Sequence, residues 1–137
     1  MKRIKTYTSA VALCIALTVA VCAAAQADMP RISLQDLKAM IDKGTPVTII
    51  DVQPRSIYEE GHIKGAISLP ASKRIALEDV WSIPSDRLIV TYCDCGPGEA
   101  DSADAAAQLF LFGYDVKVLK DPAIKGWKAA GYPLEKK

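Results

Sequence analysis

The chain has 137 residues, half of them hydrophobic, and its 17 basic and 16 acidic side chains give a formal net charge of +1. A chain of this length forms one domain of ordinary size. Balanced charge provides no basic excess of the kind that nucleic-acid binding requires. We therefore expect a single domain with no nucleic-acid partner.

The first 27 residues have the features of a secretory signal peptide. Lys2, Arg3 and Lys5 precede an alanine-rich apolar run, which ends at the cleavage-type tripeptide Ala25-Gln26-Ala27. A retained membrane anchor is the alternative, because the uncharged stretch is long enough to cross a bilayer. We predict removal of residues 1–27, export to the periplasm or beyond, and a mature monomeric domain over 28–137 without a membrane partner.

After this leader, helix and strand patterns alternate along the chain. Ser33 is expected to cap a helix over 34–43. The apolar run 47–52 is typical of a strand in a parallel sheet that is buried on both faces. The further expected elements are a helix over 54–60, a strand over 66–69, a helical turn over 76–81, a strand over 88–92, a helix over 102–112, a strand over 115–119 and a helix over 122–130.

This alternation predicts an α/β fold in which a parallel sheet carries helices on both faces. Trp127 is expected to pack the last helix against the sheet. In the helix over 102–112 we expect Gly113 to form the C-terminal cap. The residues expected to face the core there are Ala105, Ala106, Leu109 and Phe110.

The stretch 89–109 carries the predicted chemistry. Cys93 follows an apolar strand at the point where the chain turns toward a helix. Backbone N–H groups and the positive end of the helix favour a thiolate at such a position. Asp51 lies near the end of the expected strand over 47–52, and ligand sites of parallel sheets lie at this carboxyl edge. A buried strand cysteine without chemistry is the alternative to a nucleophilic Cys93.

Three groups of residues, in order along the chain, resemble the single-domain rhodanese family over about 32–135. The first lies within 51–70 and includes Asp51-Val52, Gly61-His62-Ile63 and Gly65-Ala66; the second is Tyr92-Cys93 with Ser102 and Gly113; the third is Val118-Leu119, Gly126-Trp127 and Gly131-Tyr132-Pro133. The resemblance implies a rhodanese-like three-layer domain and a sulfurtransferase of the thiosulfate or persulfide type. It further implies a persulfide on Cys93, a small sulfur donor, a thiol acceptor, and neither cofactor nor metal.

The implied active-site loop begins at Cys93 and ends at Ser102. Cys95 is interpreted as a resolving or auxiliary thiol, Asp51 and Arg55 as supporting residues, and His62 as framework. The other loop residues are Asp94, Gly96, Pro97, Gly98, Glu99, Ala100 and Asp101.

The loop departs from the family pattern in its length and its charge. It is longer than the common sulfurtransferase loop, and Asp101 stands where the family has an arginine. Carboxylates disfavour a thiolate and repel dianions, unless Arg55, Lys73 or Arg74 reaches the site. We therefore predict weak turnover of thiosulfate and better turnover of less charged donors. Related phosphatases also have long loops, but they need an arginine for the phosphate, which this loop lacks.

Two other functions remain open at this stage. One is a degenerate rhodanese module that binds a partner or ligand without turnover. The other is a thiol redox pair or soft-metal site at Cys93 and Cys95, assisted by Asp94, Glu99 or His62. Two cysteine ligands alone are weak support for structural zinc.

Overall fold

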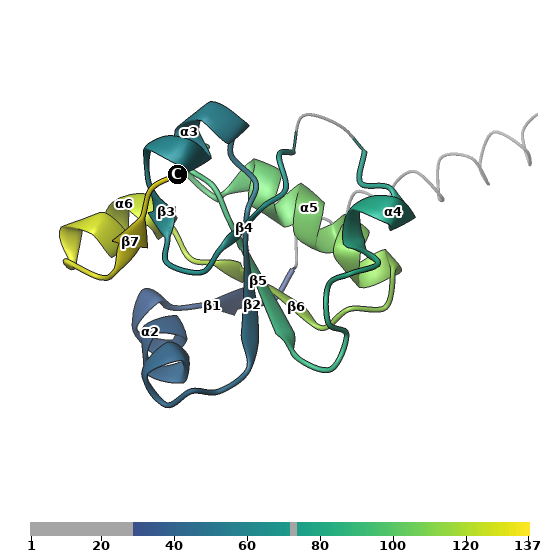
Figure 1. Cartoon of the computed structure of the whole chain (residues 1–137), viewed down its shortest axis with the longest axis horizontal. Helices are drawn as coiled ribbons and strands as arrows, with labels where there is room; N and C mark the ends of the chain where they lie inside the picture. Colours follow the sequence, from purple (N-terminus) through teal and green to yellow (C-terminus); the bar gives the residue numbers. More distant parts are fainter. Residues whose placement is uncertain (1–28, 72–73) are drawn as a thin grey trace, which may run out of the picture.

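The structure is a computed structural model that describes residues 29–71 and 74–137. A parallel sheet of five strands forms its centre (Figure 1). In spatial order the strands are β1 (Arg31–Ile32), β6 (Val116–Leu119), β5 (Leu88–Tyr92), β2 (Val47–Asp51) and β4 (Ile67–Ser68). The two central strands, β5 and β2, read as continuous apolar runs because both of their faces are covered.

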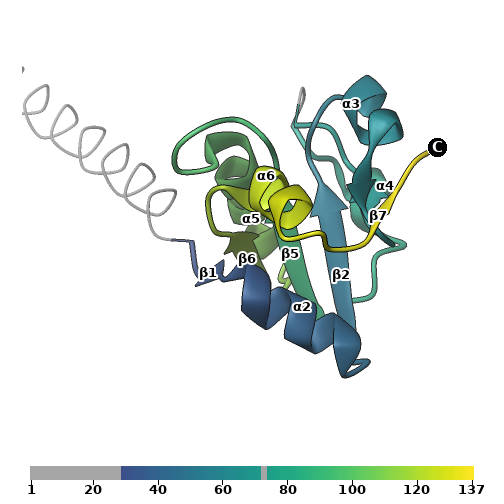
Figure 2. The same cartoon turned by 90° about the vertical axis from the view of Figure 1, so that its left-hand side faces the viewer.

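Helices cover both faces of this sheet (Figure 2). On one face lie α2 (Leu34–Asp42) and α6 (Ala123–Ala129), and on the other lie α4 (Leu77–Val80) and α5 (Ala100–Leu111). The short helix α3 (Arg55–Glu60) follows the carboxyl end of β2, near a small antiparallel sheet of β3 (His62–Ile63) and β7 (Leu134–Glu135). The predicted three-layer α/β architecture is thus confirmed.

Trp127 anchors the C-terminal part of the chain. It exposes 1% of its surface, and its indole Nε1 donates to the Pro133 carbonyl at 3.0 Å. Its helix approaches α2 so closely that a Cβ at position 126 would lie 2.5 Å from Leu34 Cδ1, so a larger residue there would force the Leu34 side chain to shift. The prediction that Trp127 packs the last helix against the sheet is confirmed.

Local signals predicted most element boundaries to within a few residues. The Ser33 hydroxyl accepts from the Asp36 N–H at 3.0 Å and caps α2, as expected. The helix after the cysteine loop begins at Ala100 instead of Ser102, so its first turn lies closer to the site. The two-residue strands β1, β3 and β7 were not predicted, since they are too short to show a period.

The expectation that Phe110 packs inward is wrong. Its side chain is 62% exposed, whereas Ala105, Ala106 and Leu109 are buried. Consecutive residues of an α-helix point about 100° apart, so the position after Leu109 turns away from the stripe that faces the sheet. Gly113 adopts a positive φ of 92° directly after the capping residue Phe112.

The predicted signal peptide, residues 1–27, lies outside the described residues and stays a prediction. Within 29–71 and 74–137, the helices are all too short or too polar to span a bilayer.

Candidate active site

Cys93 lies at the carboxyl end of β5, where the chain leaves the centre of the sheet. It exposes 2% of its surface and packs in the core cluster that contains Val52 and Ile89. Cys95 is half-buried against the same cluster. A disulfide joins the two cysteines, with their Cα atoms 5.5 Å apart. The sequence predicted two neighbouring thiols here, and the structure holds them in the oxidised state.

The loop after Cys93 curls back so that Glu99 points at the sulfur. Gly96 and Gly98 have positive φ angles, and Glu99 itself adopts left-handed backbone at φ 53°. Few residues other than glycine adopt this conformation without support. Here the Ser102 hydroxyl donates to the Glu99 carbonyl at 2.9 Å, and the Thr91 hydroxyl donates to the Ser102 carbonyl at 2.8 Å.

The Glu99 carboxyl is buried beside Cys93. Its Oε2 accepts from the Cys93 N–H at 3.1 Å and lies 3.0 Å from Cys93 Sγ. A disulfide sulfur has no proton, so in this state only a protonated carboxyl can donate across the second contact. In the dithiol state the Cys93 thiol can donate to the carboxylate instead.

Burial raises the pKa of the Glu99 carboxyl to about 7. The Cys93 N–H and Arg31 act against this rise, whereas the carboxylates of Asp121 and Asp94 add to it. A group with this pKa exchanges protons readily near neutral pH. The carboxyl can therefore serve Cys93 Sγ either as an acid or as a base.

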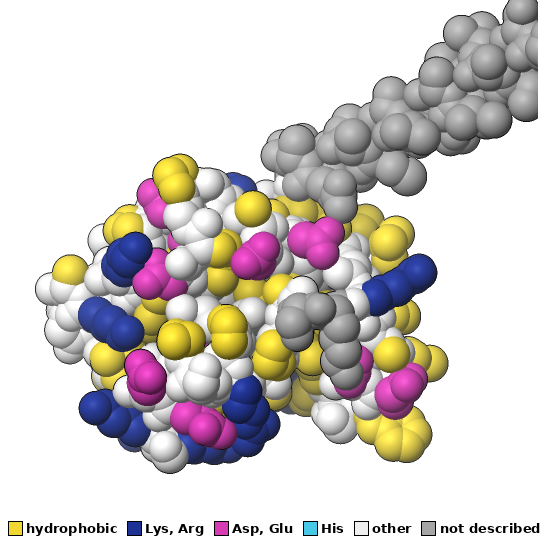
Figure 3. Space-filling view, turned by 90° about the horizontal axis from the view of Figure 1, so that it is seen from above, with side chains coloured by type: hydrophobic (Ala, Val, Ile, Leu, Met, Phe, Trp, Pro, Cys, Tyr) yellow, Lys and Arg dark blue, Asp and Glu magenta, His cyan; other side chains and the backbone are white. Residues whose placement is uncertain are grey.

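Two cations from other segments, neither of them predicted, contact the loop. Lys125 of α6 forms an ion pair with Asp94 at 2.8 Å, and Arg31 of β1 donates to the Gly98 carbonyl at 2.8 Å. Of the basic residues expected to reach the site, Arg55 pairs with Glu59, and Lys73 lies outside the described residues. Seen from above, acidic and basic side chains are interspersed on this face of the molecule (Figure 3). The acidic character of the site is thus reduced by cations from distant segments.

Asp51 lies at the carboxyl end of β2, the strand beside β5. Its carboxylate accepts from the Tyr92 hydroxyl at 2.6 Å and from the Gln53 N–H at 2.8 Å. The Tyr92 oxygen in turn accepts from the Ile63 N–H at 3.0 Å. Burial raises the pKa of Asp51, and these two donors lower it. Asp51, predicted as a supporting residue, thus accepts hydrogen bonds at this edge of the sheet, and its contact with Tyr92 was not predicted.

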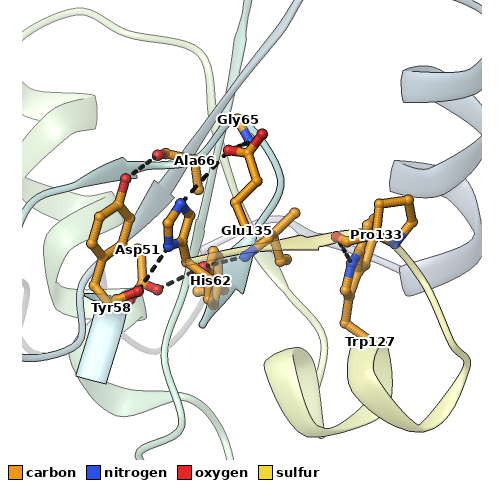
Figure 4. A network of polar contacts seen from close by, with 10 residues as sticks. Asp51, Tyr58, His62, Gly65, Ala66, Trp127, Pro133 and Glu135 are labelled. Atoms are coloured by element: carbon orange, nitrogen blue, oxygen red, sulfur yellow. Dashed lines mark hydrogen bonds and ion pairs between the residues drawn. The ribbon is translucent and has the colours of Figure 1, made fainter. Parts of the chain in front are cut away.

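His62 belongs to a cluster of polar contacts with Tyr58 and Glu135 (Figure 4). Its Nδ1 donates to the Tyr58 carbonyl at 2.7 Å, and its ring stacks on the Tyr58 ring with centroids 3.7 Å apart. The Tyr58 hydroxyl donates to the Ala66 carbonyl, and Glu135 Oε2 lies 3.8 Å from His62 Nε2. These contacts agree with the interpretation of His62 as framework.

A cavity of about 400 Å³ opens at the same edge of the sheet. Arg55 and Asp101 are its charged lining residues, and the remainder of the lining is Val52, Pro54, Pro70 and Ala71. Val52 and Ala71 also pack in the core cluster of Cys93, so the cavity lies beside the cysteine loop. One positive and one negative group in an apolar wall suit a ligand of low net charge.

Cys93, Cys95 and Glu99 bring two sulfurs and a carboxylate oxygen within 4.8 Å of one another. Metal binding at cysteine requires thiolates, and a disulfide offers none. In the structure the two sulfurs are bonded to each other, and the Glu99 carboxyl lies beside them.

Comparison with known proteins supports the predicted resemblance. A model of the rhodanese-like domain family matches residues 33–130. The probable adenylyltransferase/sulfurtransferase MoeZ of Mycobacterium tuberculosis is 31% identical over 105 residues, which are 77% of this chain and 26% of MoeZ. An HTH-type transcriptional regulator of the same organism is 35% identical over 89 residues, which are 65% of this chain and 38% of that protein. The chain thus spans less than half the length of these relatives.

Solved structures agree with the family match. A crystal structure of a Bacillus halodurans protein superposes with a TM-score of 0.72 at 30% identity, covering 79% of this chain and 77% of that one. The solution structure of the rhodanese-like domain of an Anabaena protein superposes with a TM-score of 0.64 at 32% identity, covering 80% and 81%.

Proposed function

Because this chain belongs to the rhodanese-like domain family, we propose that it transfers sulfane sulfur through a persulfide on Cys93. The observation that carries the proposal is the position of Cys93 at the carboxyl end of the central strand, where the loop turns into α5. Ligand sites of parallel sheets lie at this edge. MoeZ, a probable sulfurtransferase by its name, is a distant relative over most of this chain.

The proposed reaction is a thiol exchange at sulfur. The Cys93 thiolate attacks the outer sulfur of a donor persulfide, the donor leaves as a thiol, and Cys93 keeps the sulfur as a persulfide. A thiol acceptor then takes this outer sulfur and restores Cys93. Opening of the Cys93–Cys95 disulfide must precede the first step, because the attacking group is the thiolate.

The charges of the site favour donors of low charge. The cavity beside the loop carries Arg55 against Asp101, and Arg55 is already engaged with Glu59. Thiosulfate is a dianion and gains little from such a pair. Organic persulfides and polysulfides, which have an apolar part and a smaller charge, match the lining better.

We propose the exported space as the site of action, on the basis of the signal-type sequence over 1–27. Protein sequencing of the N-terminus after expression in a bacterium with a periplasm tests this part. A mature chain that begins at Asp28 supports it, and a retained residue 1 contradicts it.

Intact mass tests the sulfur transfer itself. The reduced protein, with dithiol removed, is mixed with glutathione persulfide, and sulfur uptake is followed by mass in the wild type, Cys93→Ser and Cys95→Ser. We expect uptake of one sulfur by Cys95→Ser and none by Cys93→Ser. Uptake by Cys93→Ser with none by Cys95→Ser would assign the persulfide to Cys95.

The disulfide favours one second candidate, a dithiol oxidoreductase that uses Cys93 and Cys95 alone. Such a protein would oxidise a substrate dithiol catalytically with no sulfur donor present. Turnover of a reduced peptide dithiol in the presence of an electron acceptor, lost in both cysteine variants, would support this candidate over sulfur transfer.

A further inference from the structure

Transfer of sulfur to an outside acceptor needs one cysteine, yet the loop holds a second cysteine bonded to the first and a buried carboxyl against their sulfur. Building on the persulfide proposed above, we propose that Cys95 reduces it. Hydrogen sulfide leaves, the Cys93–Cys95 disulfide forms, and Glu99 acts as acid and base at Cys93 Sγ.

A persulfide on Cys93 offers two sulfurs to Cys95. Attack on the outer sulfur would move the persulfide to Cys95, whereas attack on Cys93 Sγ expels the outer sulfur as hydrosulfide. The bonded pair demonstrates that the loop brings Cys95 Sγ to Cys93 Sγ, and their Cα separation of 5.5 Å is in the usual range for disulfides. The loop geometry therefore favours attack of Cys95 on Cys93 Sγ, which releases sulfide.

The loop is held in the shape that this attack requires. The Lys125–Asp94 ion pair fixes the residue between the two cysteines, and the Arg31 hydrogen bond to Gly98 fixes the far side of the curl. Positive φ angles at Gly96 and Gly98 turn the chain back over the sulfur. Contacts from β1 and α6 thus keep Cys95 close to Cys93.

The step balances without an outside oxidant. Cys93–S–SH and Cys95–SH give the Cys93–Cys95 disulfide and H₂S: the persulfide S–S bond breaks, the new S–S bond forms, and the Cys95 thiol proton leaves with the sulfide. The outer sulfur gains the two electrons that the cysteine pair loses. A dithiol reductant then restores both thiols and is itself oxidised to a disulfide.

Burial decides which sulfur the reductant meets. Cys93 is almost fully covered and Cys95 is half-exposed, so an outside thiol attacks Cys95 Sγ and Cys93 leaves as a thiolate. Glu99 Oε2, 3.0 Å away, protonates that thiolate. In the next cycle the same carboxylate removes the proton when Cys93 attacks a donor.

The charged groups around Glu99 allow its carboxyl both to donate a proton to Cys93 and to remove one from it. Asp121 after β6 and Asp94 in the loop face it with negative charge, and Arg31 from β1 faces it with positive charge. Lys125 of α6 offsets Asp94. With a pKa of about 7 the carboxyl is present in both forms near neutral pH.

A single-turnover experiment tests the sulfide release. Reduced full-length protein, freed of dithiol, receives one equivalent of glutathione persulfide, and free sulfide and intact mass are measured against the double variant Cys93→Ser/Cys95→Ser as a blank. The wild type should release close to one equivalent of sulfide and lose two hydrogens. Cys95→Ser, with Cys95→Ala as a second variant, should keep the added sulfur and release none above the blank.

The outcomes separate this inference from the proposed function. A wild type that keeps the sulfur and releases no sulfide overturns the reduction by Cys95 while the persulfide on Cys93 stands. Sulfur on Cys95 in the wild type also overturns it, because the outer sulfur was then attacked. Failure of every variant to take up sulfur overturns both proposals.

The role of Glu99 is tested by reducing the disulfide with a dithiol between pH 5 and 9. Glu99→Gln keeps the size of the side chain and an acceptor for the Cys93 N–H, and Glu60→Gln on α3 is the matched control. General acid catalysis contributes at least about a hundredfold in typical cases, so we expect reduction of Glu99→Gln to slow by about tenfold or more below pH 7. The inflection near pH 7 should also vanish. An unchanged rate and pH profile in Glu99→Gln would overturn this role.

Discussion

Two buried carboxyl groups lie at the carboxyl ends of neighbouring strands, and their surroundings differ. Asp51, after β2, accepts from the Tyr92 hydroxyl and the Gln53 N–H. Glu99, in the loop after β5, accepts from the Cys93 N–H and touches a sulfur with its Oε2. Both are almost fully covered. The first carboxyl joins segments of the framework, and the second faces a group that can react.

Burial alone does not identify a reactive acid. Burial raises the pKa of both groups. At Asp51 the hydroxyl and N–H donors offset part of that rise, whereas at Glu99 two further carboxylates add to it. The partners of a buried carboxyl, and whether one of them is a reactive atom, therefore decide between a structural and a chemical role.

The largest expected effect is on stability, from Asp51→Ala. This change leaves the Tyr92 hydroxyl and the Gln53 N–H without their acceptor, and each unsatisfied buried group costs about 1–3 kcal/mol. We expect a loss of about 3 kcal/mol in the free energy of unfolding, measured with urea at pH 7 with the disulfide intact. Asp51→Asn, which retains an acceptor for Gln53, should lose less. A loss below about 1 kcal/mol in the alanine variant would contradict a structural role for Asp51.

Glu99 should give the stability a distinctive pH dependence. Its pKa rises from an ordinary 4.5 to about 7 on folding, so the folded state holds the proton more tightly. The resulting stability is complete below pH 4.5 and is lost as pH rises through about 7. At about 1.4 kcal/mol per pKa unit, the upper limit of this loss is about 3 kcal/mol.

Between pH 5 and 8, the free energy of unfolding should therefore fall less for Glu99→Gln than for the wild type. Urea unfolding of oxidised protein at several pH values measures the difference. The contribution of Asp51 has the same sign but is present in both proteins, so it cancels. Identical slopes for the two proteins would show that Glu99 titrates as an ordinary exposed acid.

Tyr92→Phe should lower the stability of the fold without changing the reactivity of Cys93. It removes the donor to Asp51 and the acceptor of the Ile63 N–H, and we expect a loss of about 1–3 kcal/mol. The rate at which Cys93 is alkylated in the reduced Cys95→Ser background should stay within about twofold, a difference worth less than about 0.5 kcal/mol. A large change in that rate would connect the Asp51 network to the sulfur.

The smallest effect is expected from Asp101→Arg, which changes a charge in the cavity wall. Thiosulfate turnover should rise severalfold, because the new cation attracts the dianion, and the gain should shrink as salt screens the charge. Asp42→Arg at the end of α2 provides the same charge change away from the site. Turnover is measured as formation of the persulfide of the thiol acceptor. Equal or lower thiosulfate turnover in folded Asp101→Arg would show that Asp101 does not limit the reaction.

Residue patterns along the chain predicted the layers of the fold, which the structure confirms. Alternating apolar runs and amphipathic stretches predict strands and helices because each is a local property of a few neighbouring residues. Cys93 could be assigned to the carboxyl end of a strand for the same reason. The motifs around Asp51, Cys93 and Trp127 indicated the rhodanese-like family, and the family match over residues 33–130 confirms it.

The surroundings of the sulfur, in contrast, depend on contacts between segments that are distant in the sequence. Arg31 and Gly98 are 67 positions apart, and they meet because the β1 edge of the sheet lies beside the loop that follows β5. The ion pair of Lys125 with Asp94 likewise depends on how α6 packs. The pKa of Glu99 follows from burial and from charges on several elements, none of which has a local pattern. Contacts between distant segments depend on strand order and loop curvature, and these are properties of the whole fold.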